Sequence, residues 1–219
     1  NYPFMNAIIS FIKGADAANI MDSILTIVEN YPKPTLDSLM NSLSTHDTKR
    51  ILSVLDERNI ADSYINTINI NSGDDEHTFR LLSIAVSMQY TLPGVPCIFY
   101  GDEAGVYGGR DPFCRSCYPW GNENYKLVDF YKKLGRIRSE QSAFAEGDFI
   151  PYVYNKNFIS YMRKNKNNCI MCMFNMNKHV YKLDLPSNIE SYSLLLGDTD
   201  IINKTLFIKP ESFAILRCL

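Results

Sequence analysis

The 219-residue sequence has no excess of charge of either sign and no long apolar segment. It carries 22 Lys and Arg against 24 Asp and Glu, a formal net charge of −2, and its basic residues form no stripe. Nucleic-acid binding depends on such a stripe, so no nucleic-acid partner is expected. No apolar run approaches the roughly 20 residues that a membrane-spanning helix requires, so no membrane partner is expected either.

Cysteine is also scarce, with six residues in the whole chain. This is too few for a small secreted domain held by disulfides, so we expect free thiols in a reducing compartment and predict a cytoplasmic location. The sequence begins Asn1-Tyr2-Pro3-Phe4 without a signal-peptide pattern, so the location cannot be read from this end. With 46% hydrophobic and 21% charged residues, the composition is that of an ordinary folded protein.

The first two thirds of the sequence alternate between helical periodicity and short apolar runs. Apolar residues recur at helical spacing in four segments, which cover about residues 3–13, 16–30, 75–90 and 125–140. Between them, Leu36 to Leu43 and Val95 to Tyr100 are interpreted as buried strands, the second covered on both faces. This alternation predicts a strand-and-crossover α/β architecture. The intervening polar stretches, Asn59 to Asp75 and Gly101 to Asn124, are expected to be loops.

The pattern changes beyond about Ser142. Short runs of alternating apolar residues recur up to Ile215, and Asn-, Lys-, Gly- and Asp-rich turns separate them. Regularly spaced short strands with turn signals predict an antiparallel β-sandwich. We therefore divide the chain into two units, residues 1–141 and residues 142–219.

Residues that could carry chemistry follow both predicted strands of the first unit. His46 and Asp47 come after the first strand, and Asp102 and Glu103 come after the second. In barrels of alternating strands and helices, the chemistry sits at the carboxyl ends of the strands. A simpler interpretation of Asp47 is that it caps the helix that follows. Asp102 and Glu103 are interpreted as loop anchors, with Arg50 and Arg110 as their ion-pair partners.

Taken together, these segments resemble the alpha-amylase family of glycoside hydrolases, in its neopullulanase and cyclomaltodextrinase branch. The segments that carry the resemblance are Asn1-Tyr-Pro-Phe4, Asn41 to Arg50, Leu92 to Glu103 and Gly108 to Cys117 with Pro119-Trp120. They are similar to the ends of the sixth, seventh and eighth barrel strands and to the loop after the eighth. The resemblance implies the last part of a (β/α)8 barrel, with strands 7 and 8 and their helices, followed by the family's C-terminal β-sandwich.

The resemblance also implies roles for four residues. Asp47 corresponds to the family's catalytic carboxylate that stabilises the transition state, and His46 to the neighbouring substrate-binding histidine. Asp111 and Arg115 correspond to residues that hold the next sugar. Cleavage of a glycosidic bond passes through a positively charged sugar ring, and a carboxylate that accepts hydrogen bonds from ring hydroxyls can stabilise it. The expected partner is an alpha-glucan oligosaccharide such as starch, maltodextrin or cyclodextrin, and no cofactor or metal is expected.

Retaining glycosidases need a nucleophile and a proton donor, and in this family both carboxylates come from the fourth and fifth strands. No segment of this sequence resembles those strands, so we expect the chain alone to be inactive. The incomplete set of strands also leaves edges that seek partners, so we consider a homo-oligomer. The alternative function is a non-catalytic module that binds carbohydrate or a protein.

Two Cys-x-x-Cys pairs, Cys114 with Cys117 and Cys169 with Cys172, suggest a third and weaker alternative, a zinc ribbon. About fifty residues separate the pairs, which exceeds the usual spacing. Residues three apart in a strand also face opposite sides of a sheet, so Cys169 and Cys172 are not expected to share a metal ion. We therefore disfavour zinc.

Overall fold

The computed structural model of the chain describes residues 1–56, 73–187 and 189–218. The expected loop from Asn59 to Asp75 therefore falls largely outside the described residues. The helices are α1 (Tyr2–Ile12), α2 (Ala17–Asn30), α3 (Lys33–Ser38), α4 (Ile51–Leu55), α5 (Gly73–Thr91), α6 (Tyr125–Glu140) and α7 (Ala143–Glu146), with a 3₁₀ turn at Phe113–Arg115. The four helices predicted from periodicity correspond to α1, α2, α5 and α6.

The strands fall into two groups. A parallel pair joins β1 (Met40–Asn41) to β2 (Val95–Pro96). The others are β3 (Asp148–Asn155), β4 (Phe158–Lys164), β5 (Cys169–Asn175), β6 (Tyr181–Asp184), β7 (Tyr192–Gly197), β8 (Thr199–Ile202), β9 (Thr205–Ile208) and β10 (Ser212–Cys218). They form an antiparallel five-stranded sheet in the order β3-β4-β5-β10-β7 and an antiparallel three-stranded sheet in the order β6-β9-β8. This arrangement confirms the prediction of an antiparallel sandwich.

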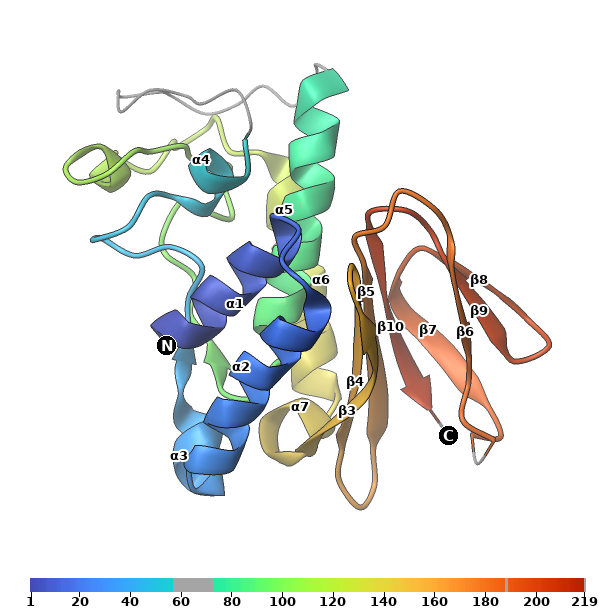
Figure 1. The fold of residues 1–219 in the computed structure, drawn as a ribbon. Coiled ribbons are helices and arrows are strands. Elements are labelled where there is room, and N and C mark those ends of the chain that lie inside the picture. Colours follow the sequence, from blue (N-terminus) through green and yellow to red (C-terminus); the bar gives the residue numbers. More distant parts are fainter. Residues whose placement is uncertain (57–72, 188, 219) are drawn as a thin grey trace.

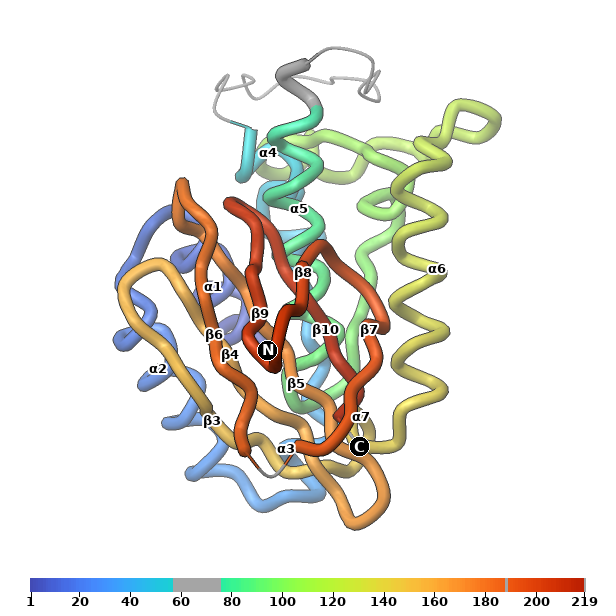
Figure 2. Tube along the Cα trace, turned by 90° about the vertical axis from the view of Figure 1, so that its right-hand side faces the viewer, coloured from blue at the N-terminus to red at the C-terminus, as the bar shows by residue number. Residues whose placement is uncertain are grey.

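The molecule is layered, with the helices on one side and the two sheets on the other (Figure 1). Helix α5 runs beside the five-stranded sheet and contacts α1, α6 and β10. The three-stranded sheet lies farthest from the helices, and Figure 2 looks onto this outer side, with α6 along one edge. Among the described residues, no helix is both long enough and apolar enough to cross a membrane.

The predicted strand from Leu36 to Leu43 is wrong over most of its length. Leu36 belongs to α3, and only Met40 and Asn41 form a strand. Pro34 lies in the first turn of α3, a position where proline favours a helix because its missing N–H has no intrahelical partner there. The first part of the apolar run therefore lies in α3, and only its later part reaches β1.

The second predicted strand is also shorter than expected, and it is not covered on both faces. Strand β2 contains only Val95 and Pro96. Val95 is 50% exposed, and its register partner Met40 is 60% exposed. The covered face packs against α5, whose Gln89 side chain donates hydrogen bonds to the backbone oxygens of Asn41 (2.9 Å) and Cys97 (3.0 Å). Helices cover one face of the strand pair, whereas the sequence pattern predicted that both faces would be covered.

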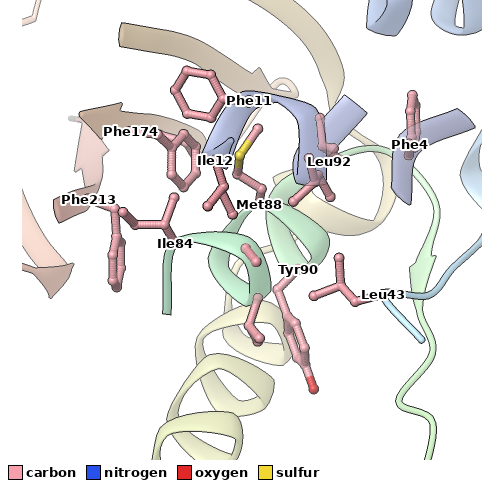
Figure 3. Close-up of a cluster of buried hydrophobic side chains, with 14 of the residues drawn as sticks. Phe4, Phe11, Ile12, Leu43, Ile84, Met88, Tyr90, Leu92, Phe174 and Phe213 are labelled. Atoms are coloured by element: carbon pink, nitrogen blue, oxygen red, sulfur yellow. The ribbon is translucent and has the colours of Figure 1, made fainter. Parts of the chain in front are cut away.

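The main apolar core extends from the helices into the five-stranded sheet. Phe4 and Phe11 from α1, Met88 from α5, and Phe174 and Phe213 from the sheet belong to one buried cluster (Figure 3). A second cluster fills the space between the two sheets and includes Met171, Leu206 and Leu216. Burial of apolar side chains of this size stabilises by roughly 1.5–3 kcal/mol each. The five-stranded sheet is thus covered on both faces.

Two arginines connect the end of α5 and the residues after it to other parts of the chain. The fully buried Arg163 of β4 donates hydrogen bonds to the backbone oxygens of Thr91 (2.8 Å) and Gly147 (3.0 Å). Arg138 of α6 donates to the backbone oxygens of Tyr90 and Gly94. Burial lowers the pKa of the Arg138 guanidinium to about 10. The division of the chain at residues 141 and 142 stays a prediction.

Candidate functional site

A tight turn presents His46 and Asp47 at its tip. The Oγ1 atom of Thr48 accepts a hydrogen bond from the Thr45 backbone N–H (2.9 Å), and the Oγ1 atom of Thr45 accepts one from the Asp47 N–H (3.2 Å). Threonine hydroxyls that bond to nearby backbone groups favour turns over continued strand or helix. Helix α4 begins at Ile51, so Asp47 is not the residue that precedes it, and the capping interpretation is wrong.

The four residues singled out from the sequence lie in a continuous row of contacts. His46 Nε2 is 3.1 Å from Asp47 Oδ2, and Asp47 Oδ1 is 3.9 Å from Arg115 Nη2. Arg115 Nε in turn pairs with Asp111 Oδ1 at 2.6 Å. All four side chains are between 50% and 63% exposed. The turn before α4 and the loop after β2 thus meet, and their charged groups face solvent together.

A buried arginine connects the turn before α4 to the loop after β2. Arg50, with no exposed surface, donates hydrogen bonds to the backbone oxygens of Cys114 (2.9 Å) and Tyr100 (2.7 Å) and pairs with Asp102 Oδ1 (3.1 Å). Its guanidinium also lies 4.5 Å from the ring centre of Phe99. The Cys114 thiol donates to the His46 backbone oxygen (3.2 Å), which adds a direct link. Arg50 and Asp102 therefore form the loop anchor expected from the sequence.

The Asp102 carboxyl has an unusual environment, because it is only 2% exposed. Burial raises its pKa from 3.8 to about 7, and the hydrogen bond with Ser44 and the Arg50 charge act in the opposite direction without cancelling it. Removal from water disfavours the charged carboxylate and so favours the bound proton. Asp102 pairs with Arg50 away from solvent, whereas the four side chains of the row are all at least half exposed.

Gly108 allows the start of the loop after β2 to lie close to the backbone of Phe113 and Cys114 in the same loop. A side-chain carbon at this position would lie 2.6 Å from the Phe113 backbone oxygen and 2.8 Å from the Cys114 Cα atom. The Gly108 backbone also accepts a hydrogen bond from the Arg50 N–H (3.0 Å) and donates one to Ser53 Oγ (2.9 Å). This glycine therefore fixes the distance between the loop and the start of α4.

An open pocket of about 270 Å³ adjoins the row of charges. His46 lines it, together with Asn1, Tyr2, Met40, Cys97 and Phe99. Its walls come from the start of α1 and from the residues of and just after β1 and β2. The pocket therefore lies at the carboxyl ends of the two parallel strands. Asn1 and Cys97 lie in segments that carry the family resemblance, but nothing in the sequence pattern marks either of them as a lining residue.

Other aromatic residues and the Cys-x-x-Cys pairs lie outside this row of contacts. Trp120 is 81% exposed and contacts Tyr118, with ring centres 4.6 Å apart. Tyr161 is fully buried, and Tyr181 stacks on Phe158, so these strand tyrosines serve packing. Among the described residues, no group of three or more His, Cys, Asp and Glu could hold a metal ion. Cys172 belongs to the core beside the helices and Cys169 to the core between the sheets, as expected for residues on opposite faces.

Comparisons with known proteins place this arrangement in context. No family model matches the chain. The amylopullulanase of Thermoanaerobacter thermohydrosulfuricus is 36% identical over 176 residues, which cover 75% of this chain and 12% of that protein. A cyclomaltodextrinase of Bacillus sp is 32% identical over 197 residues, which cover 87% of this chain and 32% of that protein. The neopullulanase 2 of Thermoactinomyces vulgaris is 34% identical over 152 residues, covering 68% and 23%.

Solved structures show the same relationship. A debranching enzyme from Nostoc punctiforme superposes with a TM-score of 0.82 at 21% identity, over 99% of this chain and 46% of that chain, which establishes the fold alone. A solved cyclomaltodextrinase superposes with a TM-score of 0.80 at 28% identity, over 100% of this chain and 36% of that one. The chain spans less than one third of the length of each of the three curated relatives above and less than half of these two structures. The chain therefore belongs to the alpha-amylase family, as a homologue of the C-terminal region of its amylopullulanase, cyclomaltodextrinase and neopullulanase members.

Proposed function

We propose that this chain forms one wall of the substrate cleft of a retaining alpha-glucan hydrolase. Its homologues are alpha-glucan hydrolases of the alpha-amylase family. The observation that supports the proposal is the row of contacts from His46 through Asp47 and Arg115 to Asp111, exposed beside an open pocket. Four charged or titratable groups held together but left open to solvent are suited to bind a polyhydroxylated ligand.

In this proposal Asp47 accepts hydrogen bonds from the hydroxyls of the reacting sugar and stabilises its positive charge in the transition state. Hydrogen bonds to a charged acceptor are about twice as strong as neutral ones. His46 lies within reach of the same carboxylate and donates to the same sugar. Arg115 and Asp111, which pair at 2.6 Å, bind the next sugar along the glucan. No cofactor and no metal ion take part in this proposal.

We also propose that the chain does not hydrolyse glucans by itself. None of its segments resembles the strands that supply the family's nucleophile and acid–base carboxylates, and both groups are needed for a retaining mechanism. The purified chain should therefore release no reducing sugar from maltodextrin. Turnover that is lost in Asp47→Asn would refute this part of the proposal.

A chimaera tests the role of Asp47 directly. The chain replaces the corresponding C-terminal region of a cyclomaltodextrinase, which keeps its own upstream carboxylates, and kcat is measured on maltodextrin and cyclodextrin. We expect the chimaera to be active and Asp47→Asn to lower kcat by about 10²–10³-fold, as removal of one electrostatic group from a transition state does. Asp22→Asn, on the exposed face of α2, is the matched control and should leave kcat unchanged. An active Asp47→Asn chimaera would exclude the proposed role.

The uncovered face of the β1–β2 pair supports a proposal of self-association by the isolated chain. Met40 and Val95 of the pair and Ile98 and Tyr100 just after β2 are all at least 40% exposed, and exposed apolar surface of this kind seeks a partner. Sedimentation velocity should show oligomers that Met40→Lys weakens. A strict monomer that binds no 8-anilinonaphthalene-1-sulfonate would contradict self-association.

The alternative function, a module that binds carbohydrate without chemistry, is favoured by one observation. Trp120 is largely exposed and lies against Tyr118, which forms an aromatic surface on which a sugar ring can stack. Under this alternative the isolated chain binds maltoheptaose in calorimetry and Trp120→Ala removes the binding, whereas the chimaera stays inactive. Because all six cysteines are free thiols, we further propose a cytoplasmic location, which fractionation of the source cells would test.

A further inference from the structure

Two cysteines lie directly opposite each other on neighbouring strands of the five-stranded sheet. Cys169 begins β5 and Cys218 ends β10, and the antiparallel register of these strands pairs the two residues. Opposed residues in antiparallel strands have Cα atoms about 4.5 or 5.5 Å apart, depending on the hydrogen-bonding pattern. Both separations fall within the range of roughly 4.4–6.8 Å that disulfides require. The backbone therefore already has the spacing of a disulfide.

The two side chains also lie on the same face of the sheet. Both pack into the apolar cluster between the two sheets, whereas Cys172 points to the opposite face and packs beside the helices. The Cys169 and Cys218 thiols are hydrogen-bonded to each other. Because the two residues are opposed in register and lie on one face, a bond between their sulfur atoms needs mainly rotation of the side chains.

The two thiols differ in their accessibility and acidity. Cys169 is partly exposed, and its pKa is lowered to about 7, chiefly because the Cys218 thiol donates a hydrogen bond to it. Lys164, the register partner of Cys169 on β4, adds a smaller favourable charge. Cys218 is buried, and its pKa is raised by the same hydrogen bond and by burial. The thiolate, which is the reactive form, is therefore available at Cys169 near neutral pH.

We propose that Cys169 and Cys218 are a modification site that forms a reversible disulfide between β5 and β10 on reaction with a low-molecular-weight disulfide such as oxidised glutathione. The Cys169 thiolate attacks one sulfur of oxidised glutathione, its S–S bond breaks, and one glutathione leaves as a thiolate that takes up a proton. Cys218 then loses its proton to solvent and attacks the Cys169 sulfur, which releases the second glutathione. The protein loses two protons and two electrons, and one oxidised glutathione becomes two reduced molecules.

The disulfide links two strands that are nearly fifty residues apart in the sequence. A cross-link over a segment of this length restricts the unfolded chain and so stabilises the folded one. Strand β10 pairs with both β5 and β7 and contacts α5, so the new bond ties the last strand of the sandwich to its centre. We expect oxidation to raise the melting temperature of the chain by about 5–10 °C.

The test is a titration of the 219-residue chain with oxidised glutathione at pH 7.5, followed by alkylation of free thiols, proteolysis and mass spectrometry under non-reducing conditions. We expect a peptide pair joined through Cys169 and Cys218, the loss of two alkylated cysteines, and full reversal by dithiothreitol. The rate should rise between pH 6 and 8 as Cys169 ionises. Free, alkylated Cys169 and Cys218 after complete oxidation of the other exposed thiols would overturn the proposal.

Two variants separate this pair from the remaining cysteines. Cys218→Ser should stop the reaction at a stable mixed disulfide of Cys169 with glutathione, because no resolving thiol remains. Cys117→Ser, which removes an exposed thiol in the loop after β2, should leave both the linkage and the shift in melting temperature unchanged. If Cys117→Ser removes the shift, or if the linked peptides contain Cys114 or Cys117 instead, the assignment to β5 and β10 is wrong. The mapping of the unmodified sequence decides the question even if a variant fails to fold.

Discussion

The two loops that form the candidate site have a buried side and an exposed side, and the two sides use charge differently. On the buried side, Arg50 has three polar partners and lies over the rings of Phe99 and Tyr100, with no surface exposed to water. On the exposed side, Arg115 has two carboxylate partners and remains half exposed. The same residue type thus fixes the loops on one side and stays accessible on the other.

The difference in burial separates residues that stabilise the fold, such as Arg50, from residues that contribute little to stability, such as Arg115. Surface ion pairs contribute about 0–1 kcal/mol, whereas breaking a buried pair by removing one partner costs about 3–5 kcal/mol. The exposed ion pairs among His46, Asp47, Arg115 and Asp111 are therefore expected to add little to the free energy of unfolding, so stability alone does not explain them. Substitutions on the two sides test this separation, because stability and ligand binding should respond in opposite ways.

The largest effect on stability is expected for Arg50→Ala. The substitution leaves the Asp102 carboxyl buried without its cationic partner and deprives the backbone oxygens of Tyr100 and Cys114 of their donor. We expect the free energy of unfolding to fall by about 3–5 kcal/mol, measured by urea denaturation at pH 8, where the Asp102 carboxyl is ionised. A loss below about 1 kcal/mol would show that the buried side does not hold the loops.

The second prediction concerns pH and Asp102. The folded protein holds a proton on this carboxyl up to about pH 7, whereas the unfolded chain releases it near the ordinary value of 3.8. The folded state therefore binds more protons in this interval, and this carboxyl makes the free energy of unfolding fall as pH rises from about 4 to 7. The fall amounts to at most about 4 kcal/mol.

Asp102→Asn should flatten this part of the pH profile in urea denaturation, because an amide does not titrate. Asp22→Asn on the exposed face of α2 serves as the control and should preserve the profile. An unchanged slope in Asp102→Asn would mean that the carboxyl is already ionised in the folded state at pH 4.

A smaller loss is expected for Gly108→Ala. The added methyl would approach the Phe113 backbone oxygen to 2.6 Å, so the loop after β2 must shift. We expect a loss of about 1–3 kcal/mol of unfolding free energy. Gly135→Ala in α6, where no atom lies within 4 Å of the added carbon, is the matched control and should stabilise by about 0.5–1 kcal/mol. Equal effects of the two substitutions would contradict the close approach at Gly108.

The smallest effect on stability is expected for Arg115→Ala. Its partners Asp47 and Asp111 stay hydrated when it is removed, so the free energy of unfolding should change by no more than about 1 kcal/mol. In the chimaera described above, the same substitution should raise KM for maltodextrin while Arg50→Ala lowers the melting temperature. An Arg115→Ala protein as unstable as Arg50→Ala would remove the distinction between the two sides.

The sequence predicted some parts of the fold better than others, and the reasons are local. Helices α2 and α6 have their expected bounds because a capping side chain, Asp16 or Asn124, precedes a clear 3.6-residue period. The run from Leu36 to Leu43 was misread because an apolar segment of this length fits a strand or a short helix, and Pro34 began a helix there. The exposure of Val95 could not be foreseen, since coverage of a strand depends on distant elements.

By itself, the sequence determined the helical and sandwich pattern, the family and the identity of the four exposed residues of the candidate site. The helical and sandwich pattern follows from periodicity and turn residues, which are local properties of the chain. The family and the four residues follow from the resemblance of short segments, and the roles of the four residues stay predictions. Only the tertiary structure decided that Arg50 reaches Cys114 across the loops, that the expected pair of Arg50 and Asp102 is buried, and that Cys169 faces Cys218. Each of these depends on two segments about fifty or more residues apart, and their contact is set by packing of the whole chain and not by either segment alone.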